Sequence, residues 1–135
     1  MYSRALMNKW ALVLGASSGF GAATCRALAD RGMNIFGVHM DRKATMPQVR
    51  ALVTSLRKQG VEVHFFNVNA VDPKKRAHVL DEIGKTLGEG GGLHVLLHSI
   101  AFGALRPYFP EEGEELSKVQ MEMTCDAMGH SLVYW

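Results

Sequence analysis

Residues 10–23 read WALVLGASSGFGAA, and this stretch decides the fold. A short apolar run from Trp10 to Leu14 stops at Gly15, and two serines and two more glycines follow. Small and apolar residues then recur at helical spacing: Ala22, Ala23, Ala27, Leu28 and Ala29. An apolar run bounded by glycine is typical of a buried strand, whereas the later spacing is typical of a helix. The stretch therefore predicts a strand, a tight glycine turn and a helix beginning at Gly19.

The three glycines of this turn are expected to have separate roles. Gly15 permits the turn itself, Gly19 lets a phosphate-bearing ligand come near, and Gly21 lets the helix pack close to its strand. Backbone N–H groups at such a turn can approach an anion, and the helix dipole adds positive potential there. The spacing is G-x-x-x-G-x-G rather than G-x-G-x-x-G.

Outward from this stretch, strands and helices alternate along the chain. The helices are marked by proline at their start, by glycine after their end and by apolar residues that recur at i, i+3, i+4 and i+7. Apolar runs mark the strands, and the run at 93–100 is continuous enough to suggest a strand covered on both faces. We expect strands at 34–39, 61–68 and 93–100, with helices at 19–31, from Thr45 to before Gly60, from Pro73 to Leu87 with Asp72 as its cap, and from 111–114 to Trp135.

This β-α-β-α-β-α-β-α order predicts an α/β fold, a doubly wound parallel sheet with helices on both faces. Such a sheet binds its ligand at the carboxyl ends of its strands, where the strand order reverses. The glycine turn lies at that end of the first strand. We therefore expect residues 1–135 to form a Rossmann domain.

Composition narrows the class of protein. The chain has 135 residues, of which 47% are hydrophobic and 21% charged, so one domain with a substantial core is possible. A net charge of +2 gives no argument for nucleic acid. No apolar run reaches the roughly 18–20 residues of a membrane helix, and no signal-peptide core is visible near the N-terminus. Cys25 and Cys125 lack metal or redox spacing, which favours reduced thiols in a cytoplasmic protein.

The GASSGFG stretch resembles the glycine motif of the short-chain dehydrogenases/reductases, enzymes that bind NAD or NADP. The resemblance implies that the pyrophosphate and adenosine side of the cofactor is held by Gly15, Ser17, Ser18, Gly19, Phe20 and Gly21. It extends over essentially the whole chain, but only over the first half of a family domain.

The segment after the second strand points to both cofactors. An acidic residue about 20 positions after the glycines binds ribose hydroxyls in dinucleotide folds, and a nearby arginine accepts a 2′-phosphate. Asp41 follows Gly21 by twenty residues and favours NAD, whereas Arg42, with Lys43 behind it, favours NADP. His39 lies where the family recognises the adenosine ribose. We expect NADP or NAD, with a lean toward NADP.

Two further stretches match the family. Asn67, Val68 and Asn69 end the third strand, where family members have Asp-Val or Asp-Leu against the adenine ring. The Asn67 amide offers both a donor and an acceptor, so it could replace the aspartate next to the adenine. Ser99, Ile100 and Ala101 are expected near the nicotinamide ribose. Their segment HSIAF, where most of the family has Asn-Asn-Ala-Gly, resembles the enoyl-acyl-carrier-protein reductases instead, which leaves a carbonyl or an enoyl thioester as the substrate.

The family's catalytic serine, tyrosine and lysine are not recognisable in this chain. No lysine follows Tyr2, Tyr108 or Tyr134 at three or six residues. Helix 121–135 resembles the long family helix that packs against a partner subunit, so a homo-oligomer is expected. Asp126 lies near the position where many family members have a catalytic asparagine. We also expect the native polypeptide to be longer, or other chains to cover the edge of strand 93–100.

Other functions remain open at this point. The chain could be an inactive dinucleotide-binding or interaction module. Residues 15–19 also fit G-x-S-x-G, the nucleophile elbow of the α/β-hydrolases, with Ser17 as the nucleophile. That interpretation leaves Gly21 unexplained and provides no earlier strand for an oxyanion loop. The six histidines form no ligand cluster, so no metal site is expected.

Overall fold

The computed structural model describes residues 4–135 and divides into two compact units, one ending at Ser99 and one spanning residues 100–135. Tyr2, one of the tyrosines considered above, lies outside the described residues.

The first unit contains a four-stranded parallel sheet in the order β3-β2-β1-β4. Its strands are β1 (Trp10–Leu14), β2 (Asn34–His39), β3 (Val63–Asn67) and β4 (Leu93–His98). The last residues of neighbouring strands lie side by side, with Leu14 opposite Val38 and His98, and His39 opposite Asn67. The carboxyl ends of all four strands therefore lie along the same side of the sheet, and the strand order confirms the doubly wound fold.

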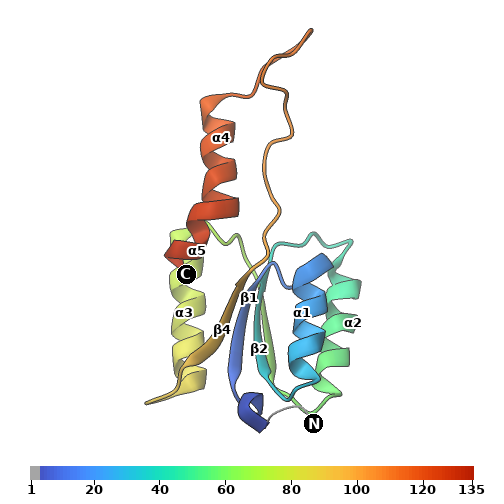
Figure 1. Ribbon diagram of the computed structural model, residues 1–135, viewed down its shortest axis with the longest axis vertical. Helices are drawn as coiled ribbons and strands as arrows, with labels where there is room; N and C mark the ends of the chain where they lie inside the picture. The colour runs from blue at the N-terminus through green and yellow to red at the C-terminus, as the bar shows by residue number, and fades with distance from the viewer. Residues whose placement is uncertain (1–3) are drawn as a thin grey trace. The chain divides into compact units, whose positions relative to one another are not determined.

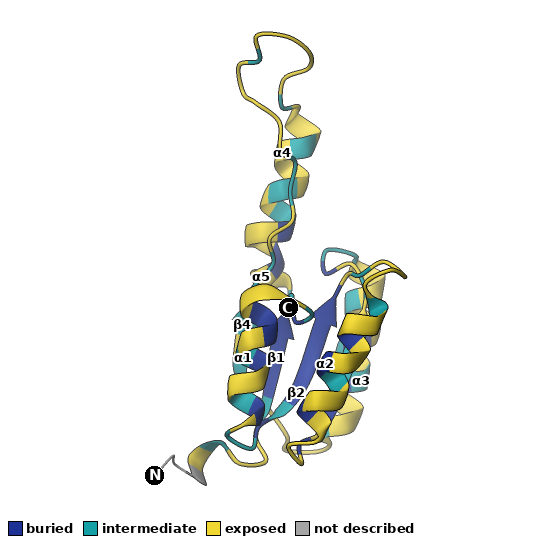
Figure 2. Ribbon diagram, turned by 90° about the vertical axis from the view of Figure 1, so that its right-hand side faces the viewer, coloured by how far each residue is buried: buried dark blue, intermediate teal, exposed yellow. Residues whose placement is uncertain are grey.

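Three helices cover the sheet: α1 (Gly19–Ala29), α2 (Met46–Arg57) and α3 (Pro73–Leu87), preceded by a short 3₁₀ turn, η1 (Arg4–Leu6). Figure 1 shows α1 and α2 on one face of the sheet and α3 on the other. This follows from right-handed crossovers that run in opposite directions from the central strand. In Figure 2 the strands β1 and β2 are buried, while the helices expose their outer sides.

Alternate residues of β1 and β2 fill the two halves of the core. Ala11, Val13 and Ile35 belong to a cluster that includes Cys25 of α1 and Leu56 of α2, all fully buried. The neighbouring residues Leu12, Leu14 and Phe36 face the other way and are fully buried too, as expected for strands inside a two-sided sheet. Burial raises the pKa of the Cys25 thiol to about 12, so this cysteine stays an inert thiol in the core.

Local sequence signals placed the start of α3 correctly and the end of α1 two residues too late. The Asp72 side chain accepts hydrogen bonds from the backbone N–H groups of Lys74 and Lys75, at 2.9 and 3.0 Å, and Pro73 opens α3 as expected. Helix α1 ends at Ala29, two residues before the predicted end, because the chain tightens there into a turn in which the Arg31 and Gly32 N–H groups donate to the Leu28 and Ala29 carbonyls, at 3.0 and 2.8 Å.

Strand β4 corrects one prediction. It was expected to be covered on both faces and to run to residue 100, but it ends at His98 and is exposed or half-buried throughout. Leu93 and Leu96 are 38% and 41% exposed. The physical reason is position: among the strands of residues 4–135, β4 pairs only with β1 and forms an edge of the sheet. Strand β3 is also shorter than predicted, covering Val63–Asn67.

The second unit is a long loop followed by a helical segment. The segment comprises α4 (Lys118–Cys125), a π-helical turn η2 (Asp126–His130) and α5 (Ser131–Tyr134). The loop packs on the helix locally, since the Ala104 N–H donates to Thr124 Oγ1 at 3.0 Å. No helix within residues 4–135 is long and apolar enough to cross a membrane.

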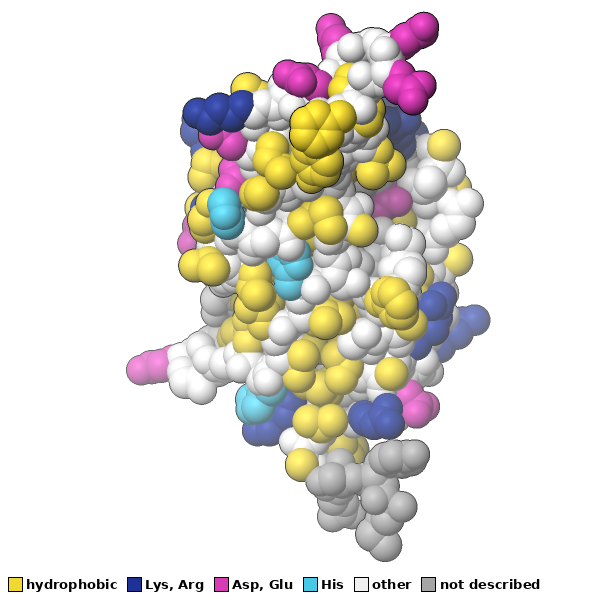
Figure 3. Space-filling model, turned by 45° about the horizontal axis from the view of Figure 1, so that its top comes forward, with side chains coloured by type: hydrophobic (Ala, Val, Ile, Leu, Met, Phe, Trp, Pro, Cys, Tyr) yellow, Lys and Arg dark blue, Asp and Glu magenta, His cyan; other side chains and the backbone are white. Residues whose placement is uncertain are grey.

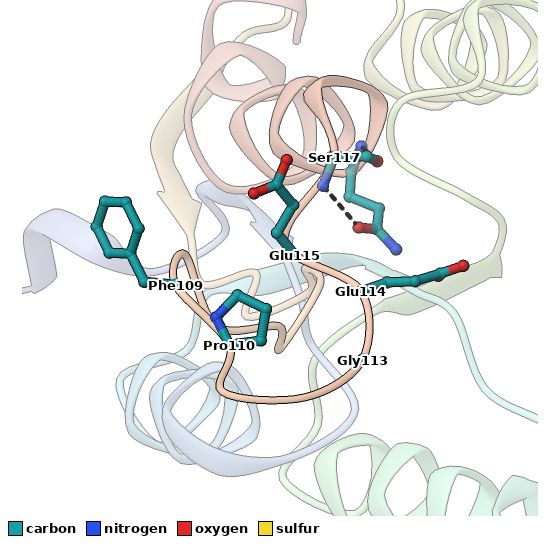
Figure 4. Close-up of a pocket in the computed structure, with 7 residues that line it drawn as sticks. Phe109, Pro110, Gly113, Glu114, Glu115 and Ser117 are labelled. Carbon is teal, nitrogen blue, oxygen red and sulfur yellow. Dashed lines mark hydrogen bonds between the residues drawn. The ribbon is translucent and has the colours of Figure 1, made fainter.

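The predicted start of this last helix, at 111–114, is wrong. The helix begins at Lys118 because Ser117 and Gln120 form a capping box: the Gln120 N–H donates to Ser117 Oγ (3.3 Å) and the Ser117 N–H donates to Gln120 Oε1 (3.0 Å). Figure 4 shows the preceding loop, which lines a pocket with Phe109, Pro110, Gly113, Glu114 and Glu115, together with Ser117 and Gln120. Gly113 (φ +89°) interrupts the acidic run, whose exposed side chains gather at the tip of this unit (Figure 3).

Candidate functional site

The glycine turn after β1 is fixed to the neighbouring strand. The backbone N–H groups of Gly15 and Ala16 both donate to the Val38 carbonyl of β2, at 2.8 and 3.0 Å. Gly15 has φ +85° and Gly19 φ +51°, a left-handed backbone that glycine adopts without strain. The turn predicted from the sequence is therefore present, held at the carboxyl edge of the sheet.

Gly21 and Gly19 differ in what surrounds them. A Cβ atom on Gly21 would lie 1.8 Å from the Gly15 carbonyl oxygen, so only glycine allows α1 to come this close to the turn. A Cβ atom on Gly19 would meet nothing within 4 Å. Gly21 thus serves close packing, as predicted, and Gly19 borders open space that a ligand can enter.

The N-terminus of α1 is suited to an anion. Ser18 is the N-cap residue, in extended conformation, but its side chain makes no capping hydrogen bond, and the first turn holds no acidic residue. The first N–H groups of a helix have no partner within the helix, and the helix dipole is positive there. Phe20, at the same end, is 86% exposed. A phosphate group fits this cradle chemically.

A carboxylate and a histidine meet just beyond the end of β2. The His39 side chain is only 2% exposed, and its Nδ1 lies 2.9 Å from Asp41 Oδ2. Its ring also lies against that of Phe65, with a centroid distance of 5.8 Å. Thr45 Oγ1 donates to the other carboxylate oxygen, Oδ1, at 2.8 Å. The two oxygens of Asp41 therefore have different partners.

Hydrogen bonds keep this carboxylate ionised. Partial burial raises the pKa of Asp41, but hydrogen bonds from Ser17, Thr45 and His39 outweigh burial and leave the pKa below its usual range. An ionised carboxylate is only an acceptor, so the bonded Nδ1 of His39 carries a proton. The Ser17 bond connects the glycine turn to the segment after β2.

Asn67, the last residue of β3, is bonded to the backbone of the same segment. Its Oδ1 accepts from the Asp41 N–H at 2.9 Å, and its Nδ2 donates to the Asp41 carbonyl at 3.0 Å. The donor and acceptor expected to face adenine are thus both engaged with Asp41. Beyond it, the Val68 N–H donates to the His39 carbonyl (2.8 Å), and Asn69 Oδ1 accepts from the Val71 N–H (3.1 Å).

The structure brings most of the predicted residues of the first unit to one edge of the sheet. The Ser99 N–H donates to the Leu14 carbonyl at 2.8 Å, immediately before the glycine turn. Arg42 and Lys43 are exposed beside Asp41. Ile100 and Ala101 belong to the second unit, so their place relative to the turn remains a prediction.

Thr45 is the residue whose role the sequence did not indicate. It was expected to start α2, and it does occupy the N-cap position, but its side chain makes no capping bond and donates to Asp41 instead. The i, i+4 spacing of Asp41 and Thr45 ahead of a helix was the available signal. Among residues 4–135, no three His, Cys, Asp or Glu side chains gather in a way that would hold a metal ion.

The family follows from comparison with known proteins. A family model described as short chain dehydrogenase matches residues 9–131. The chain belongs to the short-chain dehydrogenase family. The matched residues include all three glycines of the turn, among them Gly21, which the hydrolase interpretation left unexplained.

Solved structures of the same fold cover this chain almost completely. A 3-oxoacyl-[acyl-carrier protein] reductase from Brucella melitensis is 23% identical, with a TM-score of 0.74 over 94% of this chain and 47% of its own. An NAD⁺-bound xylitol dehydrogenase is 19% identical, with a TM-score of 0.75 over 96% and 46%. The NADPH-dependent reductase YwfH, involved in bacilysin biosynthesis, is 19% identical, with a TM-score of 0.75 over 94% and 49%. The chain thus spans about half the length of the structures that it resembles.

Proposed function

We propose that this chain supplies the cofactor-binding half of an NAD(P)-dependent oxidoreductase of the short-chain dehydrogenase type. The observation that carries the proposal is the glycine turn, where Gly21 admits the close approach of α1 and Gly19 borders open space beside an uncapped helix N-terminus. When bound, the nicotinamide would exchange a hydride with a carbonyl or an enoyl substrate. Similar structures with NAD⁺ bound or described as NADPH-dependent agree with this cofactor class.

Within the first unit, the proposed site runs along the edge where the strands end. The turn from Gly15 to Gly21 would hold the pyrophosphate. The segment from His39 to Arg42 would surround the adenosine ribose, and residues 67–69 would border the adenine. Ser99, bonded to the Leu14 carbonyl, would lie on the nicotinamide side.

We further propose NADP as the preferred cofactor. Asp41 uses both carboxylate oxygens within the protein, whereas Arg42 and Lys43 are exposed next to it. A planar guanidinium is well suited to a phosphate, which it can bind through two parallel hydrogen bonds. A 2′-phosphate would therefore find cationic partners, while a free ribose diol would compete for oxygens already in use.

The remainder of the active site is proposed to lie outside the given residues. The family resemblance implies a serine, a tyrosine and a lysine that this sequence does not contain at family spacing. We propose that the full polypeptide provides them, that it is cytoplasmic, and that it forms a homo-oligomer through the last helix. Exposed apolar residues on that segment, Val119, Leu132 and Val133, support an interface.

Titration separates this function from its alternative. The intrinsic fluorescence of the protein is followed during addition of NADPH and of NADH, and the natural full-length polypeptide is then assayed on keto and enoyl thioesters. Saturable binding with turnover supports the oxidoreductase. Binding without turnover supports a dinucleotide-binding module, and absence of binding contradicts both.

A further inference from the structure

Asp41 is hydrogen-bonded through both its side chain and its backbone. Its carboxylate accepts from Thr45 Oγ1 (2.8 Å) and faces the His39 Nδ1 (2.9 Å). Its own N–H and carbonyl are joined to the Asn67 amide at 2.9 and 3.0 Å. The residue thereby connects the end of β2, the end of β3 and the first turn of α2.

These bonds leave little of the carboxylate for a ligand. A carboxylate has about four acceptor positions on two oxygens. Thr45 and His39 use one on each oxygen, and an interaction with the Ser17 hydroxyl also lowers the pKa of the carboxyl group. A ribose that offered two hydroxyl donors would have to compete with internal donors on both oxygens. Displacing the His39 bond would leave a nearly buried imidazole N–H without its acceptor, which costs more than an exposed bond.

We propose that Asp41 is a positioning residue of the cofactor site and not the acceptor for the ribose hydroxyls. It holds the segment after β2 against β3 and α2, so that the exposed Arg42 and the glycine turn keep a fixed spacing. The inference rests on the proposed function and assigns the role of one residue of that same site.

The two roles predict different patterns of loss. If Asp41 bound the ribose directly, Asp41→Ala would weaken NADH alone and would strengthen NADPH, because a negative charge near the 2′-phosphate would be gone. If Asp41 positions the segment, the same change loosens a surface that all adenosine nucleotides share. Affinity for NADH and NADPH then falls together, and affinity for a nucleotide without a 2′-hydroxyl falls too.

The experiment compares ADP, 2′-deoxy-ADP, NADH and NADPH on the full chain by calorimetric titration. We expect Asp41→Ala to weaken all four by a similar factor of about tenfold, the size of one charge-assisted hydrogen bond lost from the site's framework. Asp81→Ala, which removes an exposed carboxylate on α3, is the matched control and leaves the binding of all four nucleotides unchanged.

A second pair of variants covers the case in which Asp41→Ala unfolds the chain. Thr45→Val removes the hydroxyl that donates to Asp41 and keeps the shape of the side chain, whereas Thr45→Ser keeps the hydroxyl. We expect Thr45→Val to weaken ADP and 2′-deoxy-ADP equally and Thr45→Ser to restore both. The inference is overturned if Asp41→Ala or Thr45→Val weakens the binding of ADP and leaves the binding of 2′-deoxy-ADP unchanged. It is also overturned if either variant only strengthens the binding of NADPH. A wild-type chain that binds none of the four nucleotides overturns the proposed function itself.

Discussion

Asn67 closes a ring of two hydrogen bonds on the backbone of Asp41. Its Oδ1 accepts from the Asp41 N–H at 2.9 Å, and its Nδ2 donates to the Asp41 carbonyl at 3.0 Å. The Asn67 side chain thus continues the hydrogen bonding between β2 and β3 beyond the end of the two strands. Only a carboxamide can both accept and donate in this geometry.

Asn67→Asp should therefore destabilise the fold at neutral pH. The carboxylate keeps the bond from the Asp41 N–H but turns the donor into an acceptor that faces a carbonyl oxygen. We expect a loss of about 1 kcal/mol in the free energy of unfolding, measured with urea at pH 7. Asn69→Asp is the matched control, because Asn69 uses only its Oδ1, toward the Val71 N–H. Equal stability of the two variants would contradict the role given to the Asn67 donor.

Gly21→Ala should damage the fold and not only the site. The new Cβ atom would be placed 1.8 Å from the Gly15 carbonyl oxygen, a backbone atom that can move only with the turn. We expect a destabilisation of about 2–3 kcal/mol in urea unfolding. Gly84→Ala, within α3 and with no atom near the new Cβ, should instead stabilise by about 0.5–1 kcal/mol. A Gly21→Ala variant as stable as wild type would show that the turn is not held as described.

Gly19→Val should abolish nucleotide binding and leave the chain folded. The side chain would enter the open space beside the N-terminus of α1, at a left-handed φ of +51°. That backbone costs about 1–2 kcal/mol for a residue other than glycine. Gly60→Val carries a similar cost, at φ +83° with open space around it, but lies just after α2. Circular dichroism should show both variants folded, and only Gly60→Val should still bind NADPH. Unchanged affinity in Gly19→Val would count against the phosphate site.

The fold could be predicted where the signal was local. The apolar run 10–14, the glycines after it and the Asp72-Pro73 pair each specify their structure over a few residues, and each is found as expected. The exposure of β4 could not be predicted in this way, because it depends on whether another strand lies beyond it. The start of α4 was predictable: Ser117 and Gln120 already have capping-box spacing.

The candidate site shows the same division. The glycine turn was predicted with its separate glycine roles because backbone conformation follows from residue type. The partners of Asp41 were not predicted, since Asn67 is 26 residues away in the sequence and meets it only through the pairing of β2 with β3. A carboxylate expected to face a ligand proved to be bonded within the protein.

Arg42→Ala should weaken NADPH more than NADH. Arg42 is exposed beside Asp41, and the loss of its guanidinium removes a partner that only a 2′-phosphate would need. We expect about a tenfold loss for NADPH and less than twofold for NADH, measured by fluorescence titration at low salt. Arg50→Ala, an exposed change within α2, should leave both affinities unchanged. Equal losses for the two cofactors would remove the case for phosphate recognition.

Asp41 should also make the stability of the fold depend on pH. Its pKa is lowered: partial burial acts against ionisation, but hydrogen bonds from Ser17, Thr45 and His39 outweigh it. A group whose pKa is lower in the folded state than in the unfolded chain, where it is about 3.9, stabilises the fold above that value. This contribution is lost as the pH falls through the folded pKa.

Asp41→Asn isolates this contribution because it removes the titrating group and keeps its shape. Urea unfolding of wild type and variant from pH 7 to pH 3 should show the largest difference in stability at pH 7 and a shrinking difference below about pH 4. Asp81→Asn, at an exposed position on α3, serves as the control for a general change in charge. A difference between wild type and Asp41→Asn that stayed constant over this range would mean that the folded protein does not favour the ionised carboxylate. It would also remove the electrostatic basis for the bonds that Asp41 makes with His39 and Thr45.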